Sequence, residues 1–494
     1  MLVSSTILLV TIACIIVHFL QWYLKKLKLY GNVPCMKSWH LIGDVPRLRG
    51  NNMVVYKNLM RYVDEYREKG ILCLWFGPNP NLLIFKDDYV QDAMGNMQNL
   101  DKHSLYKFLR PWLGCGIMTS PKERWVHSSK ILKPSFNYNI LNCFVNRIEN
   151  QTNKVLNEMD KLVGEREINI STYMKKFLHS TITEVAVGLT EGGELIEYTN
   201  STRTITQIFS RRLISPWLWT DFIFNKTPAA KIFRKCISQS HSIINKIIDD
   251  RSVIYKENMN KSEEERAQGK EKVTLLDTLF KVYYNGKVDK TFMREEMENI
   301  VFGGTDTVIT SLQWTILLVA SHPEVQKKLH DEIDVFYRET EEINAASLKK
   351  LLYLECIIKE SLRLYSPVPV VGRVAGEDFK IGNYNVKKGA DISIFLSGLH
   401  RDPKHFTDPS TFNPDRFLTE NVKHAFAFIP FAAGPRVCIG VRLAYMELKI
   451  VLSRFFQRFH VEATQKIEDI PPSMEMVLRP TKDIYAILTH RQSV

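Results

Sequence analysis

The first 24 residues, MLVSSTILLVTIACIIVHFLQWYL, contain no Asp, Glu, Lys or Arg. About 20 such residues are enough for a helix to cross the hydrocarbon layer of a membrane. Trp22 and Tyr23 close the segment and a basic stretch begins at Lys25, an order typical of a membrane interface. The segment lacks the positive N-region and the A-x-A-like site of a cleaved signal peptide. We therefore expect an uncleaved transmembrane anchor over residues 1–24, with the N-terminus outside and the remainder in the cytosol.

The chain of 494 residues carries a net charge of +12 and has a pI near 9.1. Its basic residues are dispersed and no RNA- or DNA-binding signature is present, so a nucleic-acid partner is not expected. No internal repeat and no long Gly/Ser- or Pro-rich tract divides the chain. We expect a basic, proline-containing connector over residues 25–50 and one large domain over residues 51–494. Its basic surface suits anionic lipid or an acidic protein partner.

The eight cysteines form no C-x-x-C pair. Their spacing therefore indicates neither a zinc site nor a disulfide framework, and it fits a reducing compartment. They lie at positions 14, 35, 73, 115, 143, 236, 356 and 438.

The hydrophobic pattern predicts a mainly α protein with small β-sheets, of the α+β class. Apolar runs such as ILCLWF and NLLIF predict short strands within residues 52–100, whereas helical periodicity dominates residues 121–360. Residues 257–272 are polar enough to predict a surface loop. A long apolar-faced helix is expected over residues 295–325, ended by His322-Pro323, and proline turns and short strands follow residue 365.

One cysteine lies in a loop of small residues, FAAGPRVCIG, at residues 431–440. Gly434 and Gly440 allow the backbone to turn tightly and to approach a flat cofactor. The helix expected next offers unpaired N–H groups and a positive dipole end, which favour an anionic sulfur at Cys438. Arg436 could pair with a carboxylate of the same cofactor. Because an isolated cysteine is more often a small buried apolar residue, the surrounding pattern has to decide between the two interpretations.

The pattern F-x-x-G-x-R-x-C-x-G, from Phe431 to Gly440, resembles the haem-binding loop of the cytochrome P450 family. The resemblance implies a single P450-type domain and a non-covalent haem b. It also implies that Cys438 is the axial thiolate ligand of the haem iron. Phe431, Gly434, Arg436 and Gly440 would belong to the haem site.

Two further segments resemble charged structural motifs of the same family. In IIKESLRLYSPVP, Glu360 and Arg363 lie three residues apart and therefore on one face of a helix. Such a pair on a surface would mean little. The resemblance implies instead a buried triad with Arg416 of FNPDRF, which would stabilise the core on the haem side without taking part in bond chemistry.

The segment GGTDT, residues 303–307, resembles the oxygen-activating part of the family's long helix. Gly304 weakens the helix locally, and the Thr307 hydroxyl can bond to a backbone carbonyl and open the hydrogen-bond ladder. The resemblance implies that Asp306 and Thr307 relay protons. Taken alone, Gly-Gly-Thr in a helix is more often a packing notch or a kink, and the other motifs favour the functional interpretation.

The resemblance extends over essentially the whole chain and is closest in style to family four, including its insect members. The segments that carry it are LYKFLRPWLGCGIMTS, ITSLQW, LHRDP, FNPDRF and FIPFAAGPRVCIG. Arg373 in VPVVGR and Trp125 in KERWVH match positions that bind haem propionates in relatives.

Three positions depart from the pattern of the family. The glutamate that can ester-link haem is replaced by Gly303, so the expected haem is non-covalent. The second threonine of the oxygen-activating segment is replaced by Val308. The arginine usually found four residues after the tryptophan is replaced by Ser129, and Lys130 or His127 are candidates to supply part of its charge.

The function implied is that of a microsomal monooxygenase, anchored in the endoplasmic reticulum membrane with its domain in the cytosol. It would insert one oxygen atom from O2 into a C–H bond of a lipophilic substrate such as a fatty acid, hydrocarbon, hormone or xenobiotic. Electrons would come from NADPH through a flavoprotein reductase, with cytochrome b5 as a second candidate partner. Residues 101–120 and 201–225, rich in Ile, Phe and Trp, are expected to line the substrate pocket.

Three alternatives remain at the level of sequence. A haem-thiolate isomerase or dehydratase would need no reductase, but such enzymes commonly lose the acid–threonine pair that this chain keeps at Asp306 and Thr307. A non-catalytic haem or lipid carrier would explain Val308 and Ser129 as signs of decay. An anchored helical scaffold without cofactor would leave the agreement of three motifs unexplained.

Overall fold

The computed structural model describes residues 2–36, 42–188, 193–259, 274–419 and 424–491. Most of these residues are helical. The α-helices are α1 (Leu2–Lys28), α2 (Asn52–Glu65), α3 (Asp87–Gly95), α4 (Arg110–Leu113), α5 (Lys122–Leu132), α6 (Tyr138–Asp160), α7 (Ile170–Ile182), α8 (Gly193–Leu213), α9 (Asp221–Phe224), α10 (Pro228–Met259), α12 (Leu275–Tyr284), α13 (Lys290–Ala320), α14 (Pro323–Glu339), α15 (Leu352–Leu364), α16 (Leu396–Leu399), α17 (Arg416–Thr419) and α18 (Val441–Arg458). Short 3-10 or π turns are η1 (Val45–Leu48), η2 (Ser104–Phe108), η3 (Lys133–Phe136), η4 (Thr183–Val187), η5 (Pro216–Trp219), η6 (Ser347–Lys350) and η7 (Ile467–Asp469).

The strands form four small sheets. The largest has the order β1-β2-β7-β4, with β2 and β7 parallel and the other neighbours antiparallel. The others have the orders β3-β11-β8, β10-β9 and β5-β6. The strands are β1 (Ile71–Phe76), β2 (Asn79–Ile84), β3 (Ile168–Asn169), β4 (Val370–Val374), β5 (Phe379–Ile381), β6 (Tyr384–Val386), β7 (Asp391–Phe395), β8 (Phe459–Ala463), β9 (Pro472–Met474), β10 (Leu478–Pro480) and β11 (Tyr485–His490).

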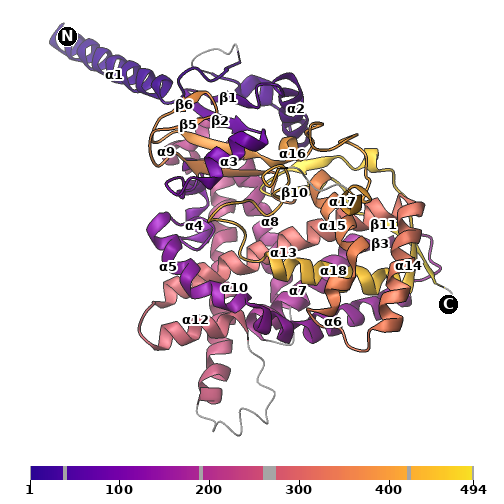
Figure 1. Ribbon diagram of the computed structural model, residues 1–494. Coiled ribbons are helices and arrows are strands. Elements are labelled where there is room, and N and C mark those ends of the chain that lie inside the picture. The colour runs from indigo at the N-terminus through magenta and orange to yellow at the C-terminus, as the bar shows by residue number, and fades with distance from the viewer. Residues whose placement is uncertain (1, 37–41, 189–192, 260–273, 420–423, 492–494) are drawn as a thin grey trace.

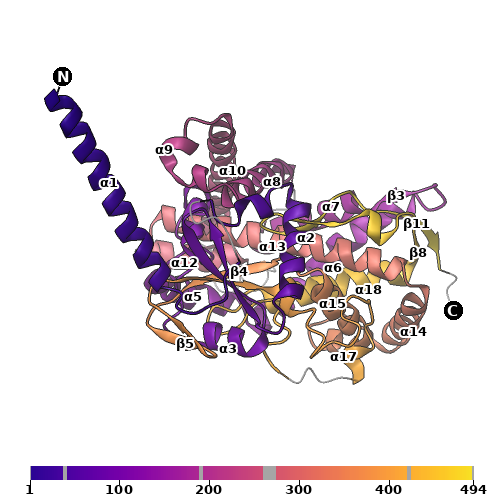
Figure 2. The ribbon, with the colours of Figure 1, turned by 90° about the horizontal axis from the view of Figure 1, so that it is seen from above.

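The long helix α13 runs through the middle of the helical region (Figures 1 and 2). It begins where the side chain of Asp289 accepts a hydrogen bond from the backbone N–H of Phe292 at 2.7 Å. Its side chains are buried on nearly every face, because α7, α10, α15 and α18 all pack against it. A helix buried on nearly every face lies in the centre of a large domain. This position carries the segment 303–307 into the interior.

Helix α1 projects away from the rest of the protein (Figures 1 and 2), and its C-terminal end meets the largest sheet, where Tyr23 and Trp75 lie 5.6 Å apart between ring centroids. Within the described residues, Val10–Lys28 is the one helical stretch long and apolar enough to cross a membrane. Its length and composition are consistent with an anchor. The helix continues past residue 24 and includes the basic residues up to Lys28.

The observed class agrees with the prediction, since the chain is mostly helical with small sheets. The run ILCLWF forms β1, and NLLIF falls largely in β2. The long helix starts at Lys290, five residues earlier than expected, because Asp289 supplies its N-terminal cap. It ends at Ala320, and Pro323 begins α14 instead. Of the expected loop 257–272, the first three residues continue α10, and residues 260–272 lie outside the described part.

A buried acid on α18, Glu447, is expected to make the stability of the protein depend on pH. Glu447 is 1 % exposed, its Oε1 has no hydrogen-bond partner among the described residues, and burial raises its pKa to about 8. In the unfolded chain the pKa of a glutamic acid is about 4.3. Between these two pH values the folded chain holds a proton that the unfolded chain has released, so this residue costs stability progressively as pH rises.

Glu447→Gln, which is neutral at every pH, is expected to remove that cost. The thermal midpoint of the variant, relative to that of the wild type, should rise between about pH 5 and about pH 8.5 by the equivalent of about 4 kcal/mol. Thermal unfolding of the two purified proteins across this range measures the difference. A difference that does not change with pH would contradict the assignment of a protonated Glu447.

Candidate active site

The loop before α18 holds Cys438 in a fixed backbone conformation. Gly434 has a φ of +71°, and a Cβ added there would lie 2.2 Å from the carbonyl oxygen of Met94. Only glycine fits such a position. The backbone N–H of Cys438 donates to the carbonyl oxygen of Phe431 at 3.0 Å, and Gly440 caps the N-terminus of α18. The loop therefore presents the thiol at the start of a helix.

The charge of the Cys438 thiol is set by opposing effects. The side chain keeps accessible surface, but the protein around its sulfur raises the thiol pKa through burial. The backbone N–H of Gly440 and the ammonium of Lys102 act in the other direction and lower the pKa. Because burial dominates, the protein alone favours the neutral thiol, and a metal ion bound to the sulfur would supply the missing stabilisation of the thiolate.

Three cationic side chains, those of Lys102, Arg373 and Arg436, are grouped near this thiol. Burial lowers the pKa of each, to about 10 for Arg436, and Arg373 lowers the pKa of the other two further by repulsion. Arg436 Nη2 donates to the carbonyl oxygen of Ser120 at 2.7 Å. Its Nε and Nη1 have no hydrogen-bond partner among the described residues.

A group of like charges that contains two buried arginines, with unused donors on Arg436, needs an anion. The two carboxylates of a haem meet that requirement, and the neighbouring thiol is the ligand type that haem iron accepts. The residues present therefore fit a haem.

The three residues considered around the propionates on α5 are placed differently from one another. The ring of Trp125 lies 4.9 Å from the guanidinium carbon of Arg436, so it contacts the cationic group directly. Ser129 is buried, whereas Lys130 is exposed on the same helix. The structure thus places Trp125 next to Arg436, and the role of the exposed Lys130 stays a prediction.

Sequence reasoning missed Lys102. This residue lies in LDKHSLYKF, within the expected pocket segment 101–120 but outside every haem motif used above. Its Nζ lies 5.3 Å from the centroid of the Tyr106 ring. It supplies a third cation near Cys438, Arg373 and Arg436, at a site where Ser129 offers none. No local pattern marks it, because its neighbours come from distant parts of the chain.

On α13, the hydroxyl of Thr307 donates to the carbonyl oxygen of Gly303 at 2.7 Å. The hydroxyls of Thr305 and Ser311 donate in the same way to carbonyls four residues earlier. Hydroxyl bonds of this kind compete with the backbone ladder and loosen a helix. The geometry matches the expectation for Thr307.

Asp306 is buried and forms an ion pair with Arg479 of β10, a partner that the sequence did not indicate. Burial alone would lower the pKa of Arg479, but Asp306 and Glu475 raise it above its ordinary value. His179, whose pKa burial lowers to about 4, is neutral at pH 7. Arg479 is therefore the cation that balances Asp306.

The two replaced positions of α13 face different surroundings. A Cβ added at Gly303 would lie 3.6 Å from Met118 Sδ, so a side chain there would point at the segment before α5. Val308 is 3 % exposed and belongs to the main hydrophobic core.

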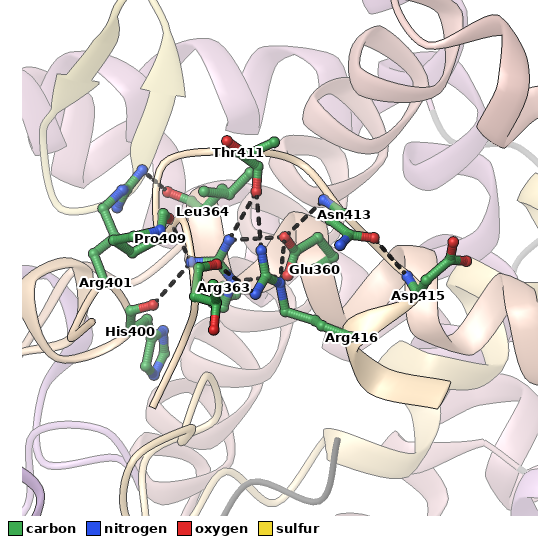
Figure 3. Close-up of polar contacts among 11 residues, drawn as sticks. Glu360, Arg363, Leu364, His400, Arg401, Pro409, Thr411, Asn413, Asp415 and Arg416 are labelled. Carbon is green, nitrogen blue, oxygen red and sulfur yellow. Dashed lines mark hydrogen bonds and ion pairs between the residues drawn. The ribbon is translucent and has the colours of Figure 1, made fainter. Parts of the chain in front are cut away.

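The predicted charged residues Glu360, Arg363 and Arg416 meet in the interior (Figure 3). Arg363 makes two hydrogen bonds of 2.7 Å to the Glu360 carboxylate, and Arg416 Nε makes a third of 3.1 Å. The two guanidinium groups also donate to backbone carbonyls of His400, Thr407, Pro409 and Thr411. All three side chains are at most 5 % exposed, so this is a buried network with its donors widely used.

His400 connects this network to the cysteine loop. Its carbonyl accepts from Arg363 Nη1, and its ring Nε2 accepts from the backbone N–H of Ile429 at 3.0 Å. Burial, followed by Arg363 and Arg401, lowers the pKa of His400 to about 3, so the ring is neutral and can accept. A change in the network would therefore reach the segment that leads to Cys438.

The two segments expected to line a substrate pocket do pack together. One apolar cluster joins Phe108 and Trp112 to Ile205 and Phe209 of α8, and it includes Phe302 of α13. The rings of Trp112 and Phe302 are 4.6 Å apart. A separate open groove of about 860 Å³, lined by residues of α4 and α10, contains none of the site residues described above.

The cysteine loop, the cationic group and the helical fold define a protein of the haem-thiolate class. The family model for Cytochrome P450 matches residues 33–488, so the chain belongs to the cytochrome P450 family. It is 34% identical to cytochrome P450 4V2 of Mus musculus, over 97% of this chain and 94% of that protein. It is 33% identical to cytochrome P450 4c21 of Blattella germanica, over 87% and 88%, and 33% identical to cytochrome P450 4c3 of Drosophila melanogaster, over 85% and 82%.

These relatives place the chain in family 4. The chain is accordingly a cytochrome P450 monooxygenase, and membership implies a haem with a cysteine thiolate ligand. Both conclusions agree with the sequence-based prediction.

Proposed function

We propose that the protein hydroxylates a lipophilic substrate at a non-covalent haem b held by Cys438. When bound, the haem supplies the dioxygen chemistry. Cys438 would ligate its iron, while Arg436, Arg373 and Lys102 would bind the propionates and Trp125 would support Arg436. The observation that carries this proposal is the buried cationic group beside the thiol, with unused donors on Arg436. Lys130, exposed on α5, remains a further candidate for a propionate contact.

In this proposal the residues of the cysteine loop hold the Cys438 sulfur in place as a thiolate. Gly434 permits the close approach to Met94, and Gly440 directs its N–H at the sulfur. Phe431 accepts the backbone hydrogen bond of Cys438 and packs on Tyr445, at 5.4 Å between ring centroids. These contacts fix the sulfur position. Gly303 has no side chain that could be linked to the haem.

We assign proton delivery to Asp306 and Thr307. The Thr307 hydroxyl, held on the Gly303 carbonyl, would donate toward the oxygen site when it rotates. Asp306 would pass a proton along after its ion pair with Arg479 opens, since that pair occupies the carboxylate in the closed form. Retention of both residues favours a monooxygenase over an isomerase.

The substrate class proposed is an apolar molecule with a reactive C–H bond. The cluster of Phe108, Trp112, Ile205, Phe209 and Phe302 would surround it. Phe302 directly precedes Gly303 on α13, and the other members come from η2, α4 and α8. Long-chain fatty acids are the first compounds to test, followed by hydrocarbons, hormones and xenobiotics. A spin-state shift on addition of each compound would report its entry.

The proposed partners follow from the reaction and the charge. Electrons would come from NADPH through an acidic flavoprotein reductase, with cytochrome b5 as an additional donor. The net charge of +12 suits such a partner, and Arg442 is an exposed cation in the first turn of the helix after Cys438. The apolar helix α1 would anchor the protein in the endoplasmic reticulum membrane, with the domain in the cytosol.

The test of this function is turnover with and without the electron donor. Purified protein with reductase, NADPH and a fatty acid should give hydroxylated product and consume O2. Product formed from a peroxide substrate without NADPH would favour an isomerase or dehydratase instead. Bound haem with no product under any donor would favour a carrier.

Thr307→Ala should lower product formation by about 100-fold, since general acid–base groups contribute about that much or more. NADPH oxidation should fall much less, so the product formed per NADPH would drop. Thr310→Val is the matched control, because Thr310 lies one turn further along α13 with a buried hydroxyl that lacks a described partner. Equal loss in the two variants would contradict the role of Thr307.

A further inference from the structure

Two cysteines far apart in the sequence lie side by side where the chain leaves the anchor. Cys35 and Cys73 are partners in an isolated parallel β-bridge, and the backbone N–H of Cys73 donates to the carbonyl oxygen of Pro34 at 2.8 Å. Bridged residues point their side chains to the same face, on strands about 4.8 Å apart. Disulfides join Cα atoms separated by about 4.4–6.8 Å, so this pair has the spacing that a disulfide needs. Both thiols are free in the structure.

The two thiols differ in exposure. Cys35 is exposed, whereas Cys73 is fully buried in the core of the largest sheet. A hydrogen bond from the Cys73 thiol, aided by one from Trp75, lowers the pKa of Cys35 to about 7 against the effect of burial. The same interaction raises the pKa of Cys73 well above its usual value. Cys35 is thus the accessible nucleophile, and Cys73 is its protected neighbour.

We propose that Cys35 and Cys73 form a hydroperoxide-sensitive dithiol at the joint between the anchor helix and the largest sheet. The Cys35 thiolate attacks the terminal oxygen of a hydroperoxide, ROOH, and the O–O bond breaks. Cys35 becomes a sulfenic acid, and ROH leaves with the proton. The Cys73 thiol then attacks the Cys35 sulfur and releases water. Two thiols and one ROOH give a disulfide, ROH and water, with two electrons passing from sulfur to oxygen.

A disulfide between Cys35 and Cys73 would affect how the anchor helix is attached to the domain. Cys35 lies shortly after the end of α1, and Cys73 lies in the middle of β1, beside the Trp75 ring that contacts Tyr23. A disulfide would tie the connector covalently to the sheet. A cellular dithiol would reverse the reaction by exchange, so the pair is compatible with a reducing compartment.

The experiment uses the full-length holoprotein in detergent or nanodiscs. The protein is treated near neutral pH with hydrogen peroxide or with a fatty-acid hydroperoxide, alkylated, digested with trypsin and analysed by mass spectrometry. We expect peptides 29–37 and 70–86 to be joined by a disulfide, and dithiothreitol should reduce that bond and separate them. Linkage by hydrogen peroxide alone would assign small peroxides as the oxidant, and linkage by both would assign hydroperoxides generally.

Matched variants separate this pair from general oxidation. Cys35→Ser should abolish the linked species, and Cys143→Ser, which changes an exposed cysteine of α6, should leave it unchanged. In Cys73→Ser, a sulfenic acid should accumulate on Cys35 and react with dimedone. Absence of the linked species from the wild type, or linkage of Cys35 to another cysteine, would overturn the proposal. These readouts do not depend on monooxygenase turnover, so they are independent of the proposed function.

Discussion

Glu360→Ala is expected to prevent the accumulation of folded, haem-containing protein. The Glu360 carboxylate is fully buried and accepts three hydrogen bonds from the guanidinium groups of Arg363 and Arg416 (Figure 3). Alanine would leave both cations in the interior without a counter-charge. Removing one partner of a buried ionic network costs about 3–5 kcal/mol, which is a large part of the stability of an ordinary domain.

The matched control on the same helix is Lys359→Ala. Lys359 pairs with Glu355 at 2.7 Å, and both side chains are about one third exposed. A surface ion pair of this kind contributes about 0–1 kcal/mol, so the variant should express and bind haem like the wild type. The yield of holoprotein and its thermal midpoint measure both effects. Equal midpoints for the two variants would mean that the network does not hold the core.

Cys438→Ser should reduce product formation to the background level. Serine has nearly the shape of cysteine, so the backbone held by Gly434 and the Phe431 hydrogen bond should persist. Its hydroxyl, however, does not ionise at neutral pH and supplies no thiolate. Arg373 and Arg436, which we propose bind the propionates, remain, so some haem should still bind with altered ligation.

This prediction is checked by measuring haem content and product together. Cys143→Ser, on the surface of α6, should change neither. Full activity in Cys438→Ser would contradict the proposed ligand. Loss of activity with an unchanged haem spectrum would show that the residue acts by another route.

Local patterns predicted the elements whose cause is local. The uncharged run at the N-terminus forms the helix α1, and the continuous apolar run ILCLWF forms β1. The glycine spacing around Cys438 predicted a tight loop at the start of a helix, and the φ of Gly434 agrees with it. Spacing by three residues also predicted the contact of Glu360 with Arg363.

The parts that the sequence did not predict depend on contacts between distant segments. Lys102 approaches Arg373 and Arg436 only because the fold brings three separate segments together. Arg479 lies on a short strand near the C-terminus and reaches Asp306 across the interior. The bridge between Cys35 and Cys73 likewise joins a turn-rich connector to β1. Without knowledge of which distant segments pack together, the sequence does not distinguish a lysine or cysteine at a site from one on an ordinary surface.

The boundaries of α13 show the same limit on a smaller scale. The apolar pattern placed the helix at residues 295–325, but a cap at Asp289 extends it to Lys290. An aspartate can cap a helix, but aspartates are also common in loops. Asp289 alone therefore did not identify the start of the helix.

The measurement that tests the central claim most directly is the difference spectrum of the reduced holoprotein with and without carbon monoxide. If Cys438 is the thiolate ligand, the wild type should show the long-wavelength Soret band of a thiolate-ligated ferrous–CO haem. Cys438→Ser should lack that band. A wild-type protein that binds no haem, or a band that survives in the serine variant, would contradict the account.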